Sequence, residues 1–141
     1  MTGEMMRLVP ALFGFSGRMR RRDFWFYTVF SNFGLFILTL IDVIVPQLVL
    51  PRGQEEPVAI GDSPAAMGIA ILFLVTIALA AWMAAALLGK RLHDRGKSLI
   101  WLLALLVPVI GWGWLFVECG LLEGSISSNK YGPSPKPAPA A

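Results

Sequence analysis

Three long apolar runs constrain this chain more than any other feature of its sequence. They cover residues 24–45, 65–88 and 99–122, and together they hold two carboxylates and no lysine or arginine. A helix of about 20 residues spans the hydrocarbon core of a bilayer, and in lipid every backbone N–H and C=O must be paired internally. We therefore predict an all-α integral membrane protein with three transmembrane helices over these runs. Residues 1–122 would form one membrane domain and residues 123–141 a flexible C-terminal tail.

The composition agrees with this prediction and excludes several classes of site. Hydrophobic residues make up 56% of the chain and charged residues only 15%, which is not the balance of a water-soluble enzyme. The single cysteine, Cys119, excludes a disulfide within the chain, and with the single histidine, His93, it cannot form a Cys/His zinc site. We expect no metal and no cofactor.

The third run contains a break near its middle. Pro108 and Gly111 stand there beside two tryptophans, which usually prefer a membrane interface. The break is either a kink in a crossing helix or the turn of a re-entrant hairpin that returns to the cytoplasmic side. We expect the kinked crossing, because 24 apolar residues suit a full span better than two short arms. That topology would place Glu118 near the outer headgroups.

The connectors carry their charges asymmetrically. Five arginines precede the first run, and residues 89–98 hold four lysines and arginines, whereas residues 46–64 hold Arg52 against three acidic residues. Positive residues in short connectors remain in the cytoplasm. We predict a multi-pass protein with a cytoplasmic N-terminus, a cytoplasmic connector at 89–98 and an outer connector at 46–64.

Two basic motifs stand on the predicted cytoplasmic side, at residues 15–25 and 90–98. In the second motif, Gly96 is predicted to end a helix in the left-handed conformation and Ser98 to cap the next one. The forked donors of arginine suit phosphate oxygens, so these motifs predict a site for an anionic lipid headgroup. The plainer interpretation is that the charges only set the orientation. The candidate headgroup-binding residues are Arg18, Arg21, Arg22, Arg91, His93, Asp94, Arg95 and Lys97.

Taken together, the motifs resemble those of a known family. The chain contains F-x-G-R-x-x-R-R-D-F-W before the first run, R-L-H-D-x-G-K-S between the second and third, P-x-x-G-W at the break and N-x-Y-G-P in the tail. This pattern is similar to that of the bacterial family named domain of unknown function 805, which consists of small inner-membrane proteins. The resemblance implies a bacterial inner (plasma) membrane location and supplies no activity, substrate or catalytic residue. The matching residues are Phe15, Gly17, Arg18, Arg21, Arg22, Asp23, Phe24, Trp25, Arg91, Leu92, His93, Asp94, Gly96, Lys97, Ser98, Pro108, Gly111, Trp112, Asn129, Tyr131, Gly132 and Pro133.

We expect a non-enzymatic binding or assembly component. Its partners would be membrane lipids, with a homo-oligomer or a larger membrane complex as further alternatives, and no nucleic acid. The alternative is a lipid-modifying enzyme or transport subunit that uses the His93–Asp94 hinge, since a carboxylate beside an imidazole tunes its proton affinity. Adjacent helical residues point in different directions, however, and we assign no catalytic residue.

Overall fold

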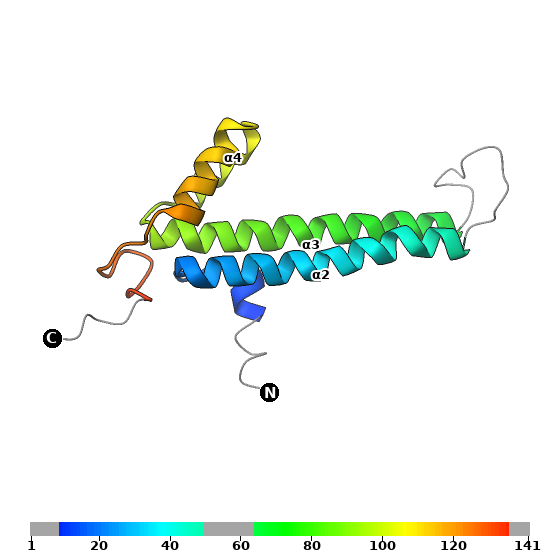
Figure 1. The fold of residues 1–141 in the computed structure, drawn as a ribbon, viewed down its shortest axis with the longest axis horizontal. Helices are drawn as coiled ribbons and strands as arrows, with labels where there is room; N and C mark the ends of the chain where they lie inside the picture. Colours follow the sequence, from blue (N-terminus) through cyan, green and yellow to red (C-terminus); the bar gives the residue numbers. More distant parts are fainter. Residues whose placement is uncertain (1–8, 50–63, 136–141) are drawn as a thin grey trace. The chain divides into compact units, whose positions relative to one another are not determined.

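The computed structural model describes residues 9–49 and 64–135, and within these residues the protein is helical (Figure 1). The predicted all-α class is confirmed, and the two long helices contain the first two apolar runs. The predicted outer connector lies, apart from its ends, outside the described residues. The elements are the α-helices α2 (Arg21–Val49) and α3 (Pro64–Asp94), the 3₁₀ helix η1 (Leu99–Leu106), the short α-helix α4 (Ile110–Leu115) and the π-helix η2 (Phe116–Leu121).

Helices α2 and α3 are both long and apolar enough to cross a membrane. Only 6% and 17% of their most apolar windows are buried within the protein. Large side chains such as Phe33 and Leu74 stay 66% and 63% exposed. Leaving apolar surface in water costs about 25 cal/mol per Å². The outward faces of both helices are therefore suited to lipid.

The chain divides into two units, and the candidate site belongs to one of them. The first unit comprises the chain up to Phe30 and from Trp82 onward, and the second comprises Ser31–Ala81. The second unit holds Asp42, whose carboxylate oxygens are buried without a hydrogen-bond partner among the described residues. Both basic motifs and all of η1, α4 and η2 lie in the first unit.

Helix α3 ends at the glycine that the sequence predicts. Gly96 has a φ of +73°, which is accessible at low cost only to glycine. Its N–H donates to the carbonyl of His93 at 2.9 Å, and the N–H of Lys97 donates to that of Leu92 at 2.9 Å, so the last turn is closed in a Schellman motif. Ser98 stands at the start of η1 as predicted, but its side chain makes no capping hydrogen bond.

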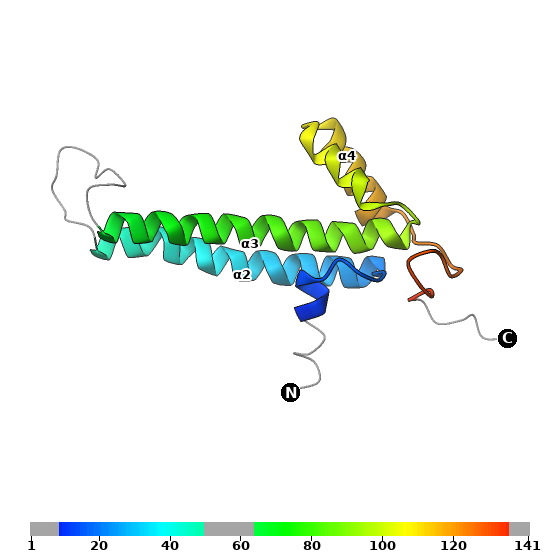
Figure 2. The same cartoon turned by 180° about the vertical axis from the view of Figure 1, so that it is seen from behind.

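The third apolar run folds as a hairpin and not as one kinked helix. Helix α4 packs back against η1, and both views show the chain reversing there (Figures 1 and 2). Across the two arms, Nε1 of Trp112 donates to the carbonyl of Leu105 at 3.1 Å, and the rings of Trp101 and Trp114 stack with centroids 4.9 Å apart. These pairs run in opposite directions along the chain, so the arms are antiparallel.

The residues at the break produce a reversal instead of a kink. Val109 has a φ of +65° and a ψ of −63°, and the N–H of Ile110 donates to the carbonyl of Pro108 at 2.7 Å, which is a γ-turn. Pro108 has no N–H and cannot continue the helix. A Cβ at Gly111 would overlap the carbonyl of Ala104, so glycine allows the arms to approach closely.

Candidate functional site

The two basic motifs meet in a buried ionic cluster. The Asp94 carboxylate accepts a hydrogen bond from Nε of Arg18 at 3.0 Å and another from Nη1 of Arg91. The three side chains are 2% exposed or less. A buried charge is tolerated only when it is paired and hydrogen-bonded. The cluster therefore depends on one carboxylate that is the ion-pair partner of two guanidinium groups.

The same arginines hold the backbone that follows η2. Arg91 donates from Nε to the carbonyl of Cys119 at 2.8 Å and from Nη2 to that of Leu122. Arg18 donates from Nη2 to the carbonyl of Ser125 at 2.6 Å. Backbone carbonyls beyond a helix end need donors, and here the arginines supply them. Within the predicted tail, the carbonyls of Ser125 and Gly132 accept hydrogen bonds from Arg18, that of Glu123 accepts one from Arg95, and Asn129 donates one to the carbonyl of His93.

Gly124 allows the tail to pass directly over the cluster. A Cβ at this position would overlap the Asp94 carboxylate. The N–H of Ser125 then donates to the Asp94 carbonyl at 2.9 Å. The tail is therefore held at Asp94 by both steric fit and a backbone hydrogen bond.

His93 joins three segments and lies beyond the apolar span at residues 65–88. Its Nδ1 lies 3.3 Å from the carbonyl of Gly17, and because a carbonyl only accepts, Nδ1 carries the proton. Its ring stacks on Tyr131 at 3.8 Å, and its own carbonyl accepts from Nδ2 of Asn129 at 2.9 Å. Burial lowers the pKa of His93, the bond to Gly17 opposes this, and the charge of Lys130 lowers the pKa further. The net effect on the pKa of His93 favours the neutral imidazole.

Glu118 pairs with two cations in the hairpin. Its Oε1 lies 2.9 Å from Nε of Arg95 and 2.9 Å from Nζ of Lys97. The Lys97 ammonium also lies over the ring of Trp114, 4.5 Å from its centroid. An unpaired carboxylate inside an apolar run is costly. Reversing the run brings Glu118 back to two cations, whereas a full crossing would have placed it near the outer headgroups.

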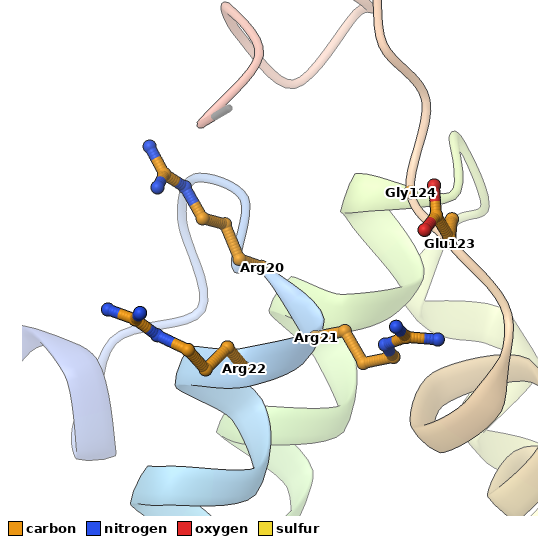
Figure 3. Close-up of a pocket in the computed structure, with 5 residues that line it drawn as sticks. All are labelled: Arg20, Arg21, Arg22, Glu123 and Gly124. Carbon is orange, nitrogen blue, oxygen red and sulfur yellow. The ribbon is translucent and has the colours of Figure 1, made fainter. Parts of the chain in front are cut away.

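A pocket lies beside the cluster, where the first apolar run begins. It has a volume of about 250 Å³ and is lined by Arg20, Arg21, Arg22, Glu123 and Gly124 (Figure 3). Three guanidinium groups and one carboxylate therefore surround it. Within the described part of the chain, the side chains of Arg20 and Arg22 donate no hydrogen bond to a protein acceptor. Their donors are available to a ligand.

Contacts between the start of α2 and the end of η2 hold the pocket together. Nη1 of Arg21 donates to the carbonyl of Leu121 at 2.8 Å, and Nε1 of Trp25 donates to that of Gly120 at 3.0 Å. A Cβ at Gly120 would lie 2.9 Å from the Trp25 ring, so a side chain there would push the two elements apart. The two walls of the pocket are thus held together by a guanidinium and an indole that each donate to a backbone carbonyl.

The structure separates the predicted headgroup residues into two groups. Six of them bind protein groups: Arg18, Arg91, His93, Asp94, Arg95 and Lys97. The other two, Arg21 and Arg22, line the pocket, and Arg21 also donates to the carbonyl of Leu121. Three residues of the pocket, Arg20, Glu123 and Gly124, were not among the predicted site residues. Arg20 could have been included because it continues the arginine run, and Glu123 because it directly follows the third apolar run.

The cluster offers little to support acid–base chemistry. Asp94 is engaged by two arginines and His93 by Gly17, and no hydrogen bond joins His93 to the Asp94 side chain in the described residues. The Cys119 thiol is fully buried. No group of three or more His, Cys, Asp or Glu residues that could hold a metal ion occurs within residues 9–49 and 64–135.

The fold and the arginine-held first unit define a small helical membrane protein, and comparison with known proteins identifies its family. The family model described as protein of unknown function (DUF805) matches residues 12–133, so the chain belongs to this family. The chain is 37% identical to inner membrane protein YhaI of Escherichia coli (strain K12), over 87% of this chain and 86% of that protein. It is 28% identical to inner membrane protein YhaH of the same strain, over 95% and 97% of the two chains. No solved structure gives a significant match. The resemblance seen in the motifs is confirmed: this is an inner-membrane protein family of unknown function.

Proposed function

We propose that the protein is a non-enzymatic component of the inner membrane that binds the phosphate of lipid headgroups, and that Arg20, Arg21 and Arg22 make the contact. The observation that carries this proposal is the pocket that these arginines line, immediately before the apolar run that starts at Phe24. That border is the depth at which lipid phosphates lie. Each cation near an anionic membrane surface contributes about 1 kcal/mol.

The residues of the two motifs take different parts in this proposal. Arg20, Arg21 and Arg22 bind the phosphate, whereas Arg18 and Arg91 hold the tail that forms the opposite wall. This division explains why the motifs contain more than positive charge. A charge that only set the orientation would need neither a carboxylate at Asp94 nor the close packing at Gly124.

The proposal includes an orientation. Both basic motifs and the tail would face the cytoplasm, and α2 and α3 would cross the bilayer with the hairpin entering from the cytoplasmic side. Two observations support it: the positive connectors belong to one unit, and the tail bonds to them through Arg18 and Ser125. The competing topology is three full crossings, with the tail outside.

Cysteine labelling tests the orientation, since the native Cys119 is buried. An exposed position in the tail, changed as Ser128→Cys, should resist a membrane-impermeant maleimide in intact spheroplasts and react after lysis. Gly53→Cys in the acidic connector should react in intact spheroplasts. Reaction of Ser128→Cys before lysis would overturn the proposed side of the tail.

Lipid retention tests the binding. The purified protein is reconstituted into nanodiscs that contain phosphatidylglycerol, and bound lipids are counted by native mass spectrometry. Arg20→Gln combined with Arg22→Gln should reduce retention about tenfold or more, at about 1 kcal/mol or more for each lost cation. Lys130→Gln removes one charge outside the pocket and should retain lipid as the wild type does. Equal retention in the wild type and the double variant would refute the proposal.

A further inference from the structure

We infer that the pocket takes a zwitterionic headgroup, in which a phosphodiester is joined to a primary ammonium, and that Glu123 selects the ammonium. This inference rests on the proposed function, which assigns the phosphate to the arginines. It adds the identity of the headgroup, which the arginines alone do not determine.

The lining of the pocket carries both signs of charge. Figure 3 shows Arg20 and Arg22 extending from the start of α2 to one side, while Glu123 lies on the other side, on the segment that follows η2. A carboxylate repels a phosphate, so a site for a purely anionic headgroup would be weakened by Glu123. In a headgroup that carries its own cation next to the phosphate, the phosphate can pair with the arginines and the cation with Glu123.

Glu123 is carried by a fixed stretch of backbone. Its carbonyl accepts a hydrogen bond from Nη1 of Arg95, and the carbonyl of the preceding Leu122 accepts one from Arg91. The following Gly124 lies directly against Asp94. The backbone that carries Glu123 is therefore positioned relative to the arginines by these contacts, as selective recognition requires.

The chemistry of the lining favours a primary ammonium over a quaternary one. A primary ammonium has three N–H donors, and an ionised carboxylate has about four acceptor positions, so Glu123 can accept from it alongside other partners. A quaternary ammonium has no N–H and is bound instead by aromatic faces. The five residues that line the pocket include no aromatic ring. The volume of about 250 Å³ also lies below the range of about 300–1,000 Å³ typical of drug-sized ligands, as expected for a small headgroup.

Competition between headgroups in one nanodisc tests this inference. The full chain is reconstituted into equal parts of phosphatidylethanolamine, phosphatidylcholine and phosphatidylglycerol, and the retained lipids are identified by native mass spectrometry. The wild type should retain phosphatidylethanolamine over phosphatidylcholine by about fivefold, the ratio given by one charged contact near the membrane surface. Glu123→Gln should lower this ratio to about one while phosphatidylglycerol is still retained. Asp23→Asn removes the same charge one residue beyond Arg22 and should keep the wild-type ratio.

The outcomes separate this inference from the proposed function. If Arg20→Gln with Arg22→Gln abolishes retention of all three lipids, but the wild type and Glu123→Gln show the same ratios, the zwitterionic assignment is wrong and phosphate binding stands. If the arginine variant retains every lipid, both fail. Soluble glycerophosphoethanolamine at millimolar concentration should not displace the lipid, and displacement would overturn the assignment to a membrane lipid. Tryptophan fluorescence of each variant confirms that it is folded.

Discussion

Removing the Asp94 carboxylate tests whether buried charge holds the two motifs together. In Asp94→Ala, Arg18 and Arg91 would each lose a carboxylate partner while their side chains remain at 2% and 0% exposure. Breaking a buried ion pair by removing one partner costs about 3–5 kcal/mol. Because one substitution here leaves two guanidinium groups without a counter-charge, we expect the upper half of that range. Asp94→Asn keeps an acceptor oxygen and the shape of the side chain, so its loss should be near 2 kcal/mol, about that of a hydrogen bond to a charged group.

The change can be measured as the free energy of unfolding in mixed micelles titrated with sodium dodecyl sulfate. All five tryptophans lie in the first unit, so their fluorescence reports on the unit that contains the cluster. Asp23→Ala is the matched control, because this carboxylate lies in the first turn of α2 and should contribute only about 0.3–1 kcal/mol. If Asp94→Ala shifted the unfolding midpoint no more than Asp23→Ala, the cluster would not stabilise the unit and our reasoning would be refuted.

Two further predictions concern the hairpin and the histidine. Gly111→Ala should destabilise the protein by about 2 kcal/mol, because the added Cβ meets the Ala104 backbone. Gly113→Ala is the control: a Cβ there has nothing within 4 Å, and stability should change by no more than about 1 kcal/mol. Equal unfolding midpoints for the two variants would count against the close approach of the arms. The pKa of His93 is lowered from its ordinary 6.5 in the folded protein, so the unfolded chain takes up the proton first and stability should fall as the pH drops through about 6.5. His93→Gln should lack this part of the pH dependence in thermal melts between pH 5 and pH 8, and a persisting drop would assign it to another group.

Run length and composition were enough to predict the helical class and the two long helices, because both follow from local apolar pattern. The path of the third run could not be predicted in the same way. Its 24 residues are long enough for a crossing, and length carries no information about where Glu118 finds cations. The pairing of Glu118 with Arg95 and Lys97 depends on residues more than 20 positions away in the chain. Two features of the third run were the available signals for a hairpin. Glu118 is a lone carboxylate in an apolar run, and Pro108 cannot continue a helix.

The structure also shows why arginine and lysine would not be interchangeable in these motifs. Arg18 donates five hydrogen bonds, from all three of its nitrogens, to acceptors on the tail and on Asp94. Arg91 donates four in the same manner, to acceptors that include Cys119 and Leu122. A lysine offers three donors from a single atom and cannot span acceptors that lie this far apart. Charge-preserving substitution at Arg18 or Arg91 would therefore leave the net charge unchanged and still release the tail that carries Glu123. The forked geometry of Arg18 and Arg91, and not their charge alone, therefore links the buried cluster to the pocket.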